Sequence, residues 1–155
     1  MGIKEVELRR KIISIAKREV GEKEMPENTN LTKYGKWFDL NGVMWCGIFV
    51  SYCYAHAGKQ IRNGGFLRGF AGCQYFANKT TNNITSDPLF GDIVFFDWTK
   101  DGRFDHVGIF IGWNNDNTFN TIEGNTSIGN DSNGGEVMMR VRKNNANIRF
   151  INIIK

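Results

Sequence analysis

The sequence has little proline, histidine or cysteine. Its 155 residues include two prolines, two histidines and three cysteines. So few prolines give little sign of a stiff linker between domains, and the length suits a single domain that spans residues 1–155. Hydrophobic residues make up 41% of the chain, which is enough to build a core. We therefore expect a single domain and no separate second domain.

Long apolar segments are also missing. No apolar run approaches about 18 residues, so we expect no membrane span. The N-terminus is charged at Lys4, Glu5 and Glu7, where a secretory signal would turn apolar. We expect no signal peptide and synthesis in the cytoplasm.

The three cysteines, Cys46, Cys53 and Cys73, are an odd number, and no two of them form a Cys-x-x-Cys pair. This usage argues against a disulfide framework and against a structural zinc site. The Asp97–Asp105 segment holds three aspartates but lacks the alternating spacing of a calcium loop, and a solvated hairpin is the better interpretation. We expect no metal and no cofactor.

The formal net charge is +4, which would attract nucleic acid, an anionic cell wall or a membrane surface alike. No arginine-, lysine- and aromatic-rich motif of a nucleic-acid-binding module is present. We therefore do not expect nucleic acid as a partner.

The periodicity of hydrophobic residues changes halfway along the chain. Helical spacing predicts helices in the first half, at 4–20, near 31–38, from Cys46 to Gly58 and around 70–79. Alternating and apolar runs bounded by turns predict strands at 92–97, 106–112, 119–123, 137–142 and 148–153. Because helices precede strands without alternating with them, we predict an α+β fold with an antiparallel sheet.

Cys46 stands at or just before the first turn of the predicted third helix. The backbone N–H groups and the dipole at a helix N-terminus stabilise a thiolate there. Cys53 lies two turns later within the apolar pattern, and Cys73 lies in a context without a comparable signature. We interpret Cys53 and Cys73 as small buried residues and Cys46 as a candidate nucleophile.

A thiol nucleophile needs a base, and the base needs an orienting partner. His56 lies in the predicted third helix and is interpreted as exposed, whereas His106 begins a predicted strand. The turn at 113–118 would bring the next strand alongside, and with it Glu123 or Asn125. We therefore expect His106 to be the base, with Glu123 or Asn125 beside it.

Four ordered motifs carry a resemblance to a known family. They are WCGIFVS at 45–51, GDIVFF at 91–96, DHVGI at 105–109 and IEGNT at 122–126. Together they resemble the CHAP family of cysteine, histidine-dependent amidohydrolases/peptidases. The resemblance implies a papain-like fold with N-terminal helices packed on the sheet, and hydrolysis of amide bonds in peptidoglycan. It also implies Cys46 as nucleophile, His106 as base and Glu123 as the residue that orients His106, with Asn125 at a fourth polar position of the site.

Other residues are weaker candidates. The backbone N–H of Cys46 would be one donor to the oxyanion that forms when the thiolate attacks a carbonyl carbon. Asn41 and Tyr34 precede Cys46 and are candidates for a second donor. Trp45, Phe104 and Trp113 are candidates for lining the substrate cleft, although burial in the core is the competing interpretation for each.

The function implied is that of a phage or bacterial lysin that cleaves either the N-acetylmuramoyl-L-alanine bond or a stem or cross-bridge peptide bond. It would act at the cell wall after release through a holin, from a virion or by export. A partner subunit or a parent protein would be one source of wall affinity. Two alternatives stay open: an exported toxin that acts as a peptidase or deamidase on another substrate, and a non-catalytic wall-binding module.

Overall fold

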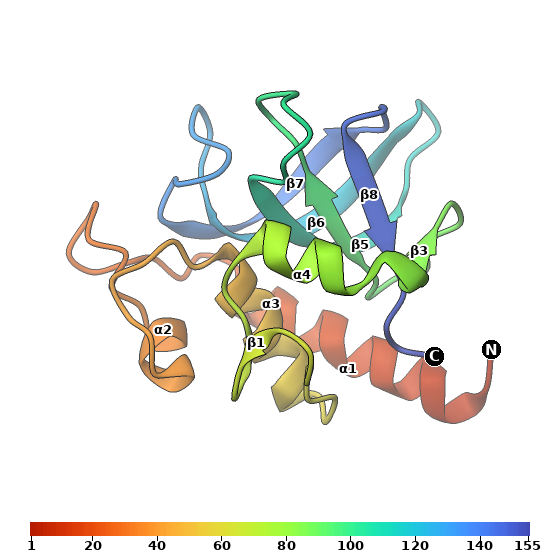
Figure 1. Cartoon of the computed structure of the whole chain (residues 1–155), viewed down its shortest axis with the longest axis horizontal. Helices are drawn as coiled ribbons and strands as arrows, with labels where there is room; N and C mark the ends of the chain where they lie inside the picture. The colour runs from red at the N-terminus through yellow and green to blue at the C-terminus, as the bar shows by residue number, and fades with distance from the viewer.

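The computed structural model describes all residues, 1–155, and places four helices against one face of a six-stranded antiparallel sheet (Figure 1). The helices are α1 (Ile3–Glu19), α2 (Lys33–Phe38), α3 (Cys46–His56) and α4 (Cys73–Lys79), with a 3₁₀ turn at Thr81–Asn83. The sheet strands are β3 (Ile84–Thr85), β4 (Ile93–Phe96), β5 (His106–Trp113), β6 (Thr118–Thr126), β7 (Glu136–Lys143) and β8 (Ile148–Ile151). The α+β prediction is confirmed.

The strands lie in the order β3-β8-β4-β5-β6-β7, with every neighbouring pair antiparallel. The four predicted helices and five predicted strands are all present. The sequence pattern missed β3 and a separate hairpin of β1 (Gly65–Phe66) and β2 (Gly69–Phe70). Each missed strand has only two residues, which is too short for an alternating pattern to be recognised.

Helix α1 buries Ile12, Ile15 and Ala16, as its spacing predicts. Arg9 of the same helix is fully buried, although arginine is a charged residue. The Arg9 guanidinium donates from Nη1 to Asp92 Oδ1 at 2.8 Å and to the carbonyl of Phe90 at 3.0 Å. This buried ion pair brings two opposite charges together and connects α1 to the segment just before β4.

Helix α3 is the central element of the helical layer. Eight of its eleven residues are buried, because it packs against β5 and β6 on one side and against α1 and α2 on the others. A helix that is apolar nearly all round is expected in such a position. The nucleophile candidate at its first residue is therefore held by the 26-residue core rather than by a surface loop.

The two faces of the sheet carry different cores. Phe95, Val107 and Ile109 belong to the core shared with the helices. Successive side chains of a strand point to opposite faces, and a smaller cluster of Val94, Phe96, Phe110, Phe119 and Phe150 covers the other face. Trp98 packs against this smaller cluster.

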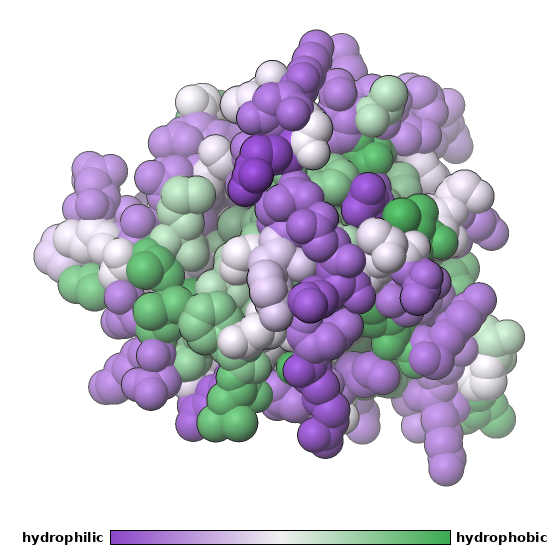
Figure 2. Space-filling model, in the orientation of Figure 1, coloured by the Kyte–Doolittle hydropathy of each residue, from purple (hydrophilic) through white to green (hydrophobic).

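The face of the molecule shown in Figure 2 is mainly hydrophilic, with apolar side chains gathered over α2 and the β1 hairpin. Phe66 and Leu67 of that hairpin are exposed. None of the helices combines the length and the apolar character that a membrane span requires.

Candidate active site

Cys46 is the first residue of α3 and lines a cleft with a volume of about 620 Å³. Its sulfur lies 3.6 Å from the sulfur of Cys73, the first residue of α4. Both cysteines are free and buried. The helix-start position predicted for Cys46 is confirmed, whereas no sequence pattern indicates that Cys73 lies against it.

His106, the first residue of β5, lies beside Glu123 of β6. The imidazole Nε2 is 2.8 Å from Glu123 Oε1, and both side chains are fully buried. The other ring nitrogen, Nδ1, is buried and makes no hydrogen bond, so it is the nitrogen available to Cys46. The turn between β5 and β6 thus brings Glu123 to His106, as the sequence predicted for one of its two candidates.

Cys46 and His106 shift each other's pKa. The contact with Cys73 is the largest influence on the Cys46 thiol; together with His106 and the Gly47 N–H it outweighs burial and holds the pKa well below its usual value. Burial alone would lower the pKa of His106, but Cys46 and Glu123 raise it to about 9. These opposite shifts favour a thiolate at Cys46 and an imidazolium at His106, the reactive form of a cysteine nucleophile.

Cys73 stays protonated beside this thiolate. Its contact with Cys46 and its burial both raise the pKa of the Cys73 thiol well above the usual value. A protonated thiol is a weak hydrogen-bond donor. The direction of these shifts favours the Cys73 S–H as the donor and the Cys46 sulfur as the acceptor in the contact between the two sulfurs.

Glu123 remains ionised although it is buried. Burial alone would raise the pKa of its carboxyl, but hydrogen bonds from Arg142 and His106 outweigh burial and hold the pKa at about 2. An ionised carboxylate accepts the hydrogen of Nε2–H and stabilises the imidazolium. This is the orienting role that the family resemblance implies for Glu123.

Gly108 makes room for the Glu123 side chain. Gly108 lies two residues after His106 on β5, and a Cβ built there would lie 2.6 Å from Glu123 Cγ. Any side chain at position 108 would therefore push Glu123 away from His106. The DHVGI motif thus contains both the base and the space for its partner.

The cleft beside Cys46 runs between the start of α4 and the loop that joins β4 to β5. Phe104 lines it, as predicted, and the Phe104 N–H donates to the side chain of Gln74, another lining residue, at 2.7 Å. Trp98 lines the same cleft and lies over His106, with ring centroids 6.3 Å apart. The sequence analysis did not single out Trp98.

Asn125 is buried, but its side chain turns toward the loop after β6. Its Nδ2 donates to Asn133 Oδ1 at 3.0 Å, and its Oδ1 accepts from the Gly135 N–H at 3.0 Å. Its φ of 57° lies in the left-handed region, which asparagine tolerates better than most residues. Asn125 therefore holds the 127–135 loop, and a direct catalytic role for it stays a prediction.

The two oxyanion candidates are not brought to Cys46. Asn41 Oδ1 accepts from the backbone N–H groups of Thr32 and Gly42, so Asn41 stabilises the turn around α2. Tyr34 is fully buried and stacks on Trp45, with centroids 5.5 Å apart. Neither lines the cleft. The donor that the geometry does offer is the free backbone N–H of Cys46 at the start of α3.

Two of the three predicted cleft aromatics lie elsewhere. Trp45 has no exposed surface, and its indole N–H donates to Glu24 at 3.3 Å. Trp113 packs edge-on against Phe110 and Phe119, at the far end of β5 from His106. Trp45 is thus a core residue, in line with the competing interpretation, whereas Trp113 packs on aromatic rings and stays 43% exposed. Neither of them lines the cleft.

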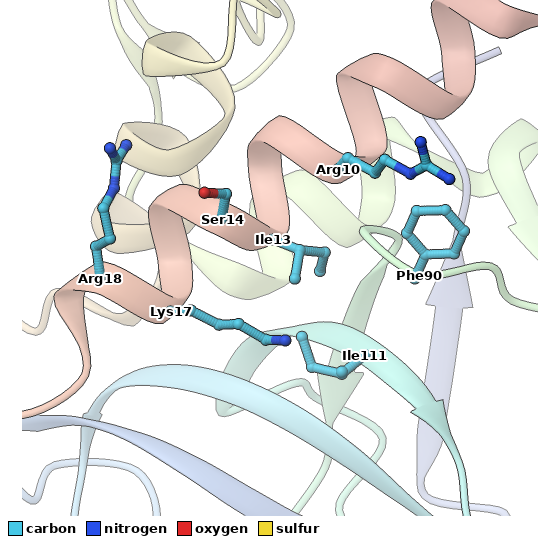
Figure 3. A pocket seen from close by; sticks show the side chains of 7 residues that line it. All are labelled: Arg10, Ile13, Ser14, Lys17, Arg18, Phe90 and Ile111. Atoms are coloured by element: carbon cyan, nitrogen blue, oxygen red, sulfur yellow. The ribbon is translucent and has the colours of Figure 1, made fainter.

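A second hollow lies between α1 and the loop before β4, where Arg10 and Lys17 extend beside Phe90 and Ile111 (Figure 3). It shares no lining residue with the Cys46 cleft. It contains neither a thiol nor a histidine, so it does not compete with Cys46 as the catalytic centre.

The aspartates between β4 and β5 serve the loop itself. Asp97 accepts from the backbone N–H groups of Asp101 and Gly102, and Asp105 accepts from that of Thr99. These bonds are those of a polar hairpin turn, in agreement with the predicted solvated hairpin.

The sequence matches the model of a known domain family. The CHAP domain model matches residues 38–125, more than half of the chain, and this segment contains Cys46, His106 and Glu123. A search of curated proteins finds no match.

Proposed function

Because the chain belongs to the CHAP domain family, whose members are generally amidohydrolases or peptidases, we propose that it hydrolyses amide bonds in peptidoglycan with Cys46 as the nucleophile. The observation that carries this proposal is the buried arrangement of Cys46, His106 and Glu123. Acyl transfer by a thiol needs a nucleophile, an acid/base and a group that orients the acid/base. The thiolate at the helix start, the imidazolium beside it and the ionised carboxylate next to the imidazole would fill these three roles.

The reaction proceeds in two steps. The Cys46 thiolate attacks the carbonyl carbon, and the backbone N–H of Cys46 donates to the oxyanion that forms. His106 gives the proton at Nδ1 to the leaving amine, which leaves a thioester on Cys46. His106 then takes a proton from water, the hydroxide attacks the thioester, and the acid is released while the thiolate returns.

Peptidoglycan is the substrate that the family suggests. The cleft suits a peptide substrate because it combines apolar side chains, such as Tyr75 and Phe104, with polar ones, such as Gln74 and Arg103. The same residues serve an amidase, which cleaves at muramic acid, and an endopeptidase, which cleaves within the stem or cross-bridge. We propose that the protein works as a phage or bacterial lysin, made in the cytoplasm and acting at the cell wall.

Purified sacculi test the proposal. Incubation with the protein should release new amino groups, and mass spectrometry of the products identifies the bond. Cys46→Ala and His106→Ala should each abolish release. Cys53→Ala is a matched control, because Cys53 is a buried thiol of the same helix that lies outside the cleft, and it should remain active.

Three results would overturn the proposal. Full activity in Cys46→Ala would remove the nucleophile. Intact sacculi together with cleavage or deamidation of a protein substrate would retain the chemistry and replace the substrate by that of a toxin. Binding to sacculi without any release would identify a wall-binding module instead.

A further inference from the structure

The Glu123 carboxylate has more hydrogen-bond donors around it than an orienting residue needs. Besides His106, Arg142 of β7 donates from Nε to Oε2 at 2.8 Å and from Nη2 to Oε1 at 2.5 Å. The hydroxyl of Thr121 also donates to Oε2, at 2.5 Å. The Arg142 fork thus binds both oxygens of the carboxylate that holds the catalytic imidazole.

Arg142 is itself fixed from all sides. Its guanidinium lies 4.8 Å from the Trp98 ring centroid and 5.5 Å from that of Phe96, within the range of cation–π attraction. Its remaining nitrogen, Nη1, donates to Asp131 at 2.8 Å. Only 8% of the Arg142 side chain is exposed. Such a side chain cannot move aside without leaving charges buried and unpaired.

The protonation state of Glu123 decides where the protons of His106 lie. A buried carboxyl without a cationic partner becomes neutral. A neutral Glu123 stabilises the imidazolium less and can donate its own hydrogen to Nε2, which would leave the neutral imidazole with its hydrogen on Nδ1. An ionised Glu123 accepts from Nε2–H instead, so the proton exchanged with Cys46 is the one on Nδ1.

We propose that Arg142 is a positioning residue of this active site: its fork keeps Glu123 ionised and oriented, so that His106 presents Nδ1 to Cys46. The assignment deepens the proposed function, because it relies on Cys46, His106 and Glu123 being the catalytic set. It adds a residue outside the segment that the family model matches.

Arg140 offers a matched comparison on the same strand. Its guanidinium binds Asp131 at 2.9 Å, Thr126 at 2.7 Å and the carbonyl of Ser127 at 2.9 Å, and it does not bind Glu123. Arg140 therefore shares the strand and the loop contact of Arg142 but lacks the contact with the carboxylate. Any effect that comes from β7 or from the 127–135 loop should appear in both variants.

The experiment measures alkylation of Cys46 by iodoacetamide against pH, with peptide mapping by mass spectrometry to follow this thiol alone. This readout needs no substrate, so it is separate from the test on sacculi. The rate of alkylation falls at acidic pH as the Cys46 thiolate becomes protonated, and the midpoint is the pH at which this rate is half its maximum. In Arg142→Met this midpoint should move to higher pH by about one unit or more, because Glu123 then takes up a proton more readily. Arg140→Met should retain the wild-type midpoint. On any substrate that the wild type cleaves, the acid limb of kcat/KM should move in the same direction.

A folded Arg142→Met with the wild-type midpoint would overturn the proposal, and so would an equal shift in Arg140→Met. If Arg142→Met does not fold, Arg142→Gln takes its place in the same measurement and should shift the midpoint in the same direction, because glutamine keeps an amide donor and loses the charge. In a Glu123→Gln background, Arg142→Met should not shift the midpoint further, since no carboxyl is left to titrate. Inactivity of the wild type on sacculi alongside the expected shift would reject the substrate and leave the role of Arg142 intact.

Discussion

Replacing Cys73 by alanine should raise the pKa of the Cys46 thiol. The two sulfurs are 3.6 Å apart, and the contact with Cys73 is the largest influence that lowers the pKa of Cys46. The alanine variant loses the S–H donor but retains a small apolar side chain at the start of α4. The thiolate loses one partner while His106 remains in place.

The size of this effect follows from the kind of hydrogen bond. A hydrogen bond to a charged group contributes about 1.5–3 kcal/mol, and a thiol is a weak donor, so the lower end applies. Since about 1.4 kcal/mol corresponds to one pKa unit, the midpoint for Cys46 should rise by about one pH unit. The thiolate form predominates above the midpoint, so the variant should react more slowly at mildly acidic pH and normally at alkaline pH.

Alkylation by iodoacetamide, followed at the Cys46 peptide over the acidic and neutral range, measures the shift. Cys73→Ser retains a hydroxyl donor and should shift the midpoint less. Cys53→Ala removes a thiol that has no hydrogen-bond contact with Cys46 and should leave the midpoint unchanged. If Cys73→Ala alkylates with the wild-type midpoint, then Cys73 does not donate to the thiolate, and His106 and the Gly47 N–H lower its pKa without it.

Three further predictions concern the surroundings of the site. Gly108→Ala should lower kcat/KM at least tenfold by displacing Glu123 from the imidazole, whereas Gly112→Ala, where a Cβ meets nothing within 4 Å on the same strand, should have little effect in the same assay. Arg9→Met should lower the free energy of unfolding by about 3–5 kcal/mol in urea denaturation, because it leaves the buried Asp92 carboxylate without its partner; a loss below about 1 kcal/mol would contradict the role given to this pair. Because the pKa of Glu123 is about 2 against a usual 4.5, its ionisation stabilises the fold fully above about pH 4.5, and this contribution disappears as the pH falls toward 2; urea denaturation at several pH values should show a weaker dependence in this range for Glu123→Gln, and an unchanged dependence would exclude Glu123 as its source.

The sequence alone sufficed to predict the helices and strands whose hydrophobic residues recur with a clear periodicity. Helix α1 and strands β4 to β8 follow their hydrophobic patterns closely enough to be placed within a few residues, and the positions of Cys46 and His106 at the first residues of α3 and β5 follow from them. The pairing of β5 with β6 then brings Glu123 near His106, because a short turn joins antiparallel neighbours.

The contact between Cys73 and Cys46 depends instead on how α4 packs against α3, which is tertiary information. Cys73 looks like an ordinary small residue at the start of a short helix, and neither hydrophobic spacing nor a local motif marks it. The same limit explains Trp45, whose burial is decided by the shape of the core rather than by its neighbours in sequence.

Arg142 shows how a hydrophobic pattern can mislead at a functional site. On β7 the apolar Val141 is 63% exposed, whereas Arg142 beside it is buried. The usual rule, which places apolar residues of a strand toward the core and charged ones toward solvent, therefore assigns both residues to the wrong face. The inversion is stable because Glu123, Asp131 and the rings of Phe96 and Trp98 compensate the guanidinium for the water that it loses. Exposing valine and burying arginine on the same strand is unfavourable, and packing contacts alone do not compensate for it. The contact with Glu123 connects Arg142 to His106. A buried arginine where the strand pattern expects an exposed one therefore indicates the proposed catalytic centre.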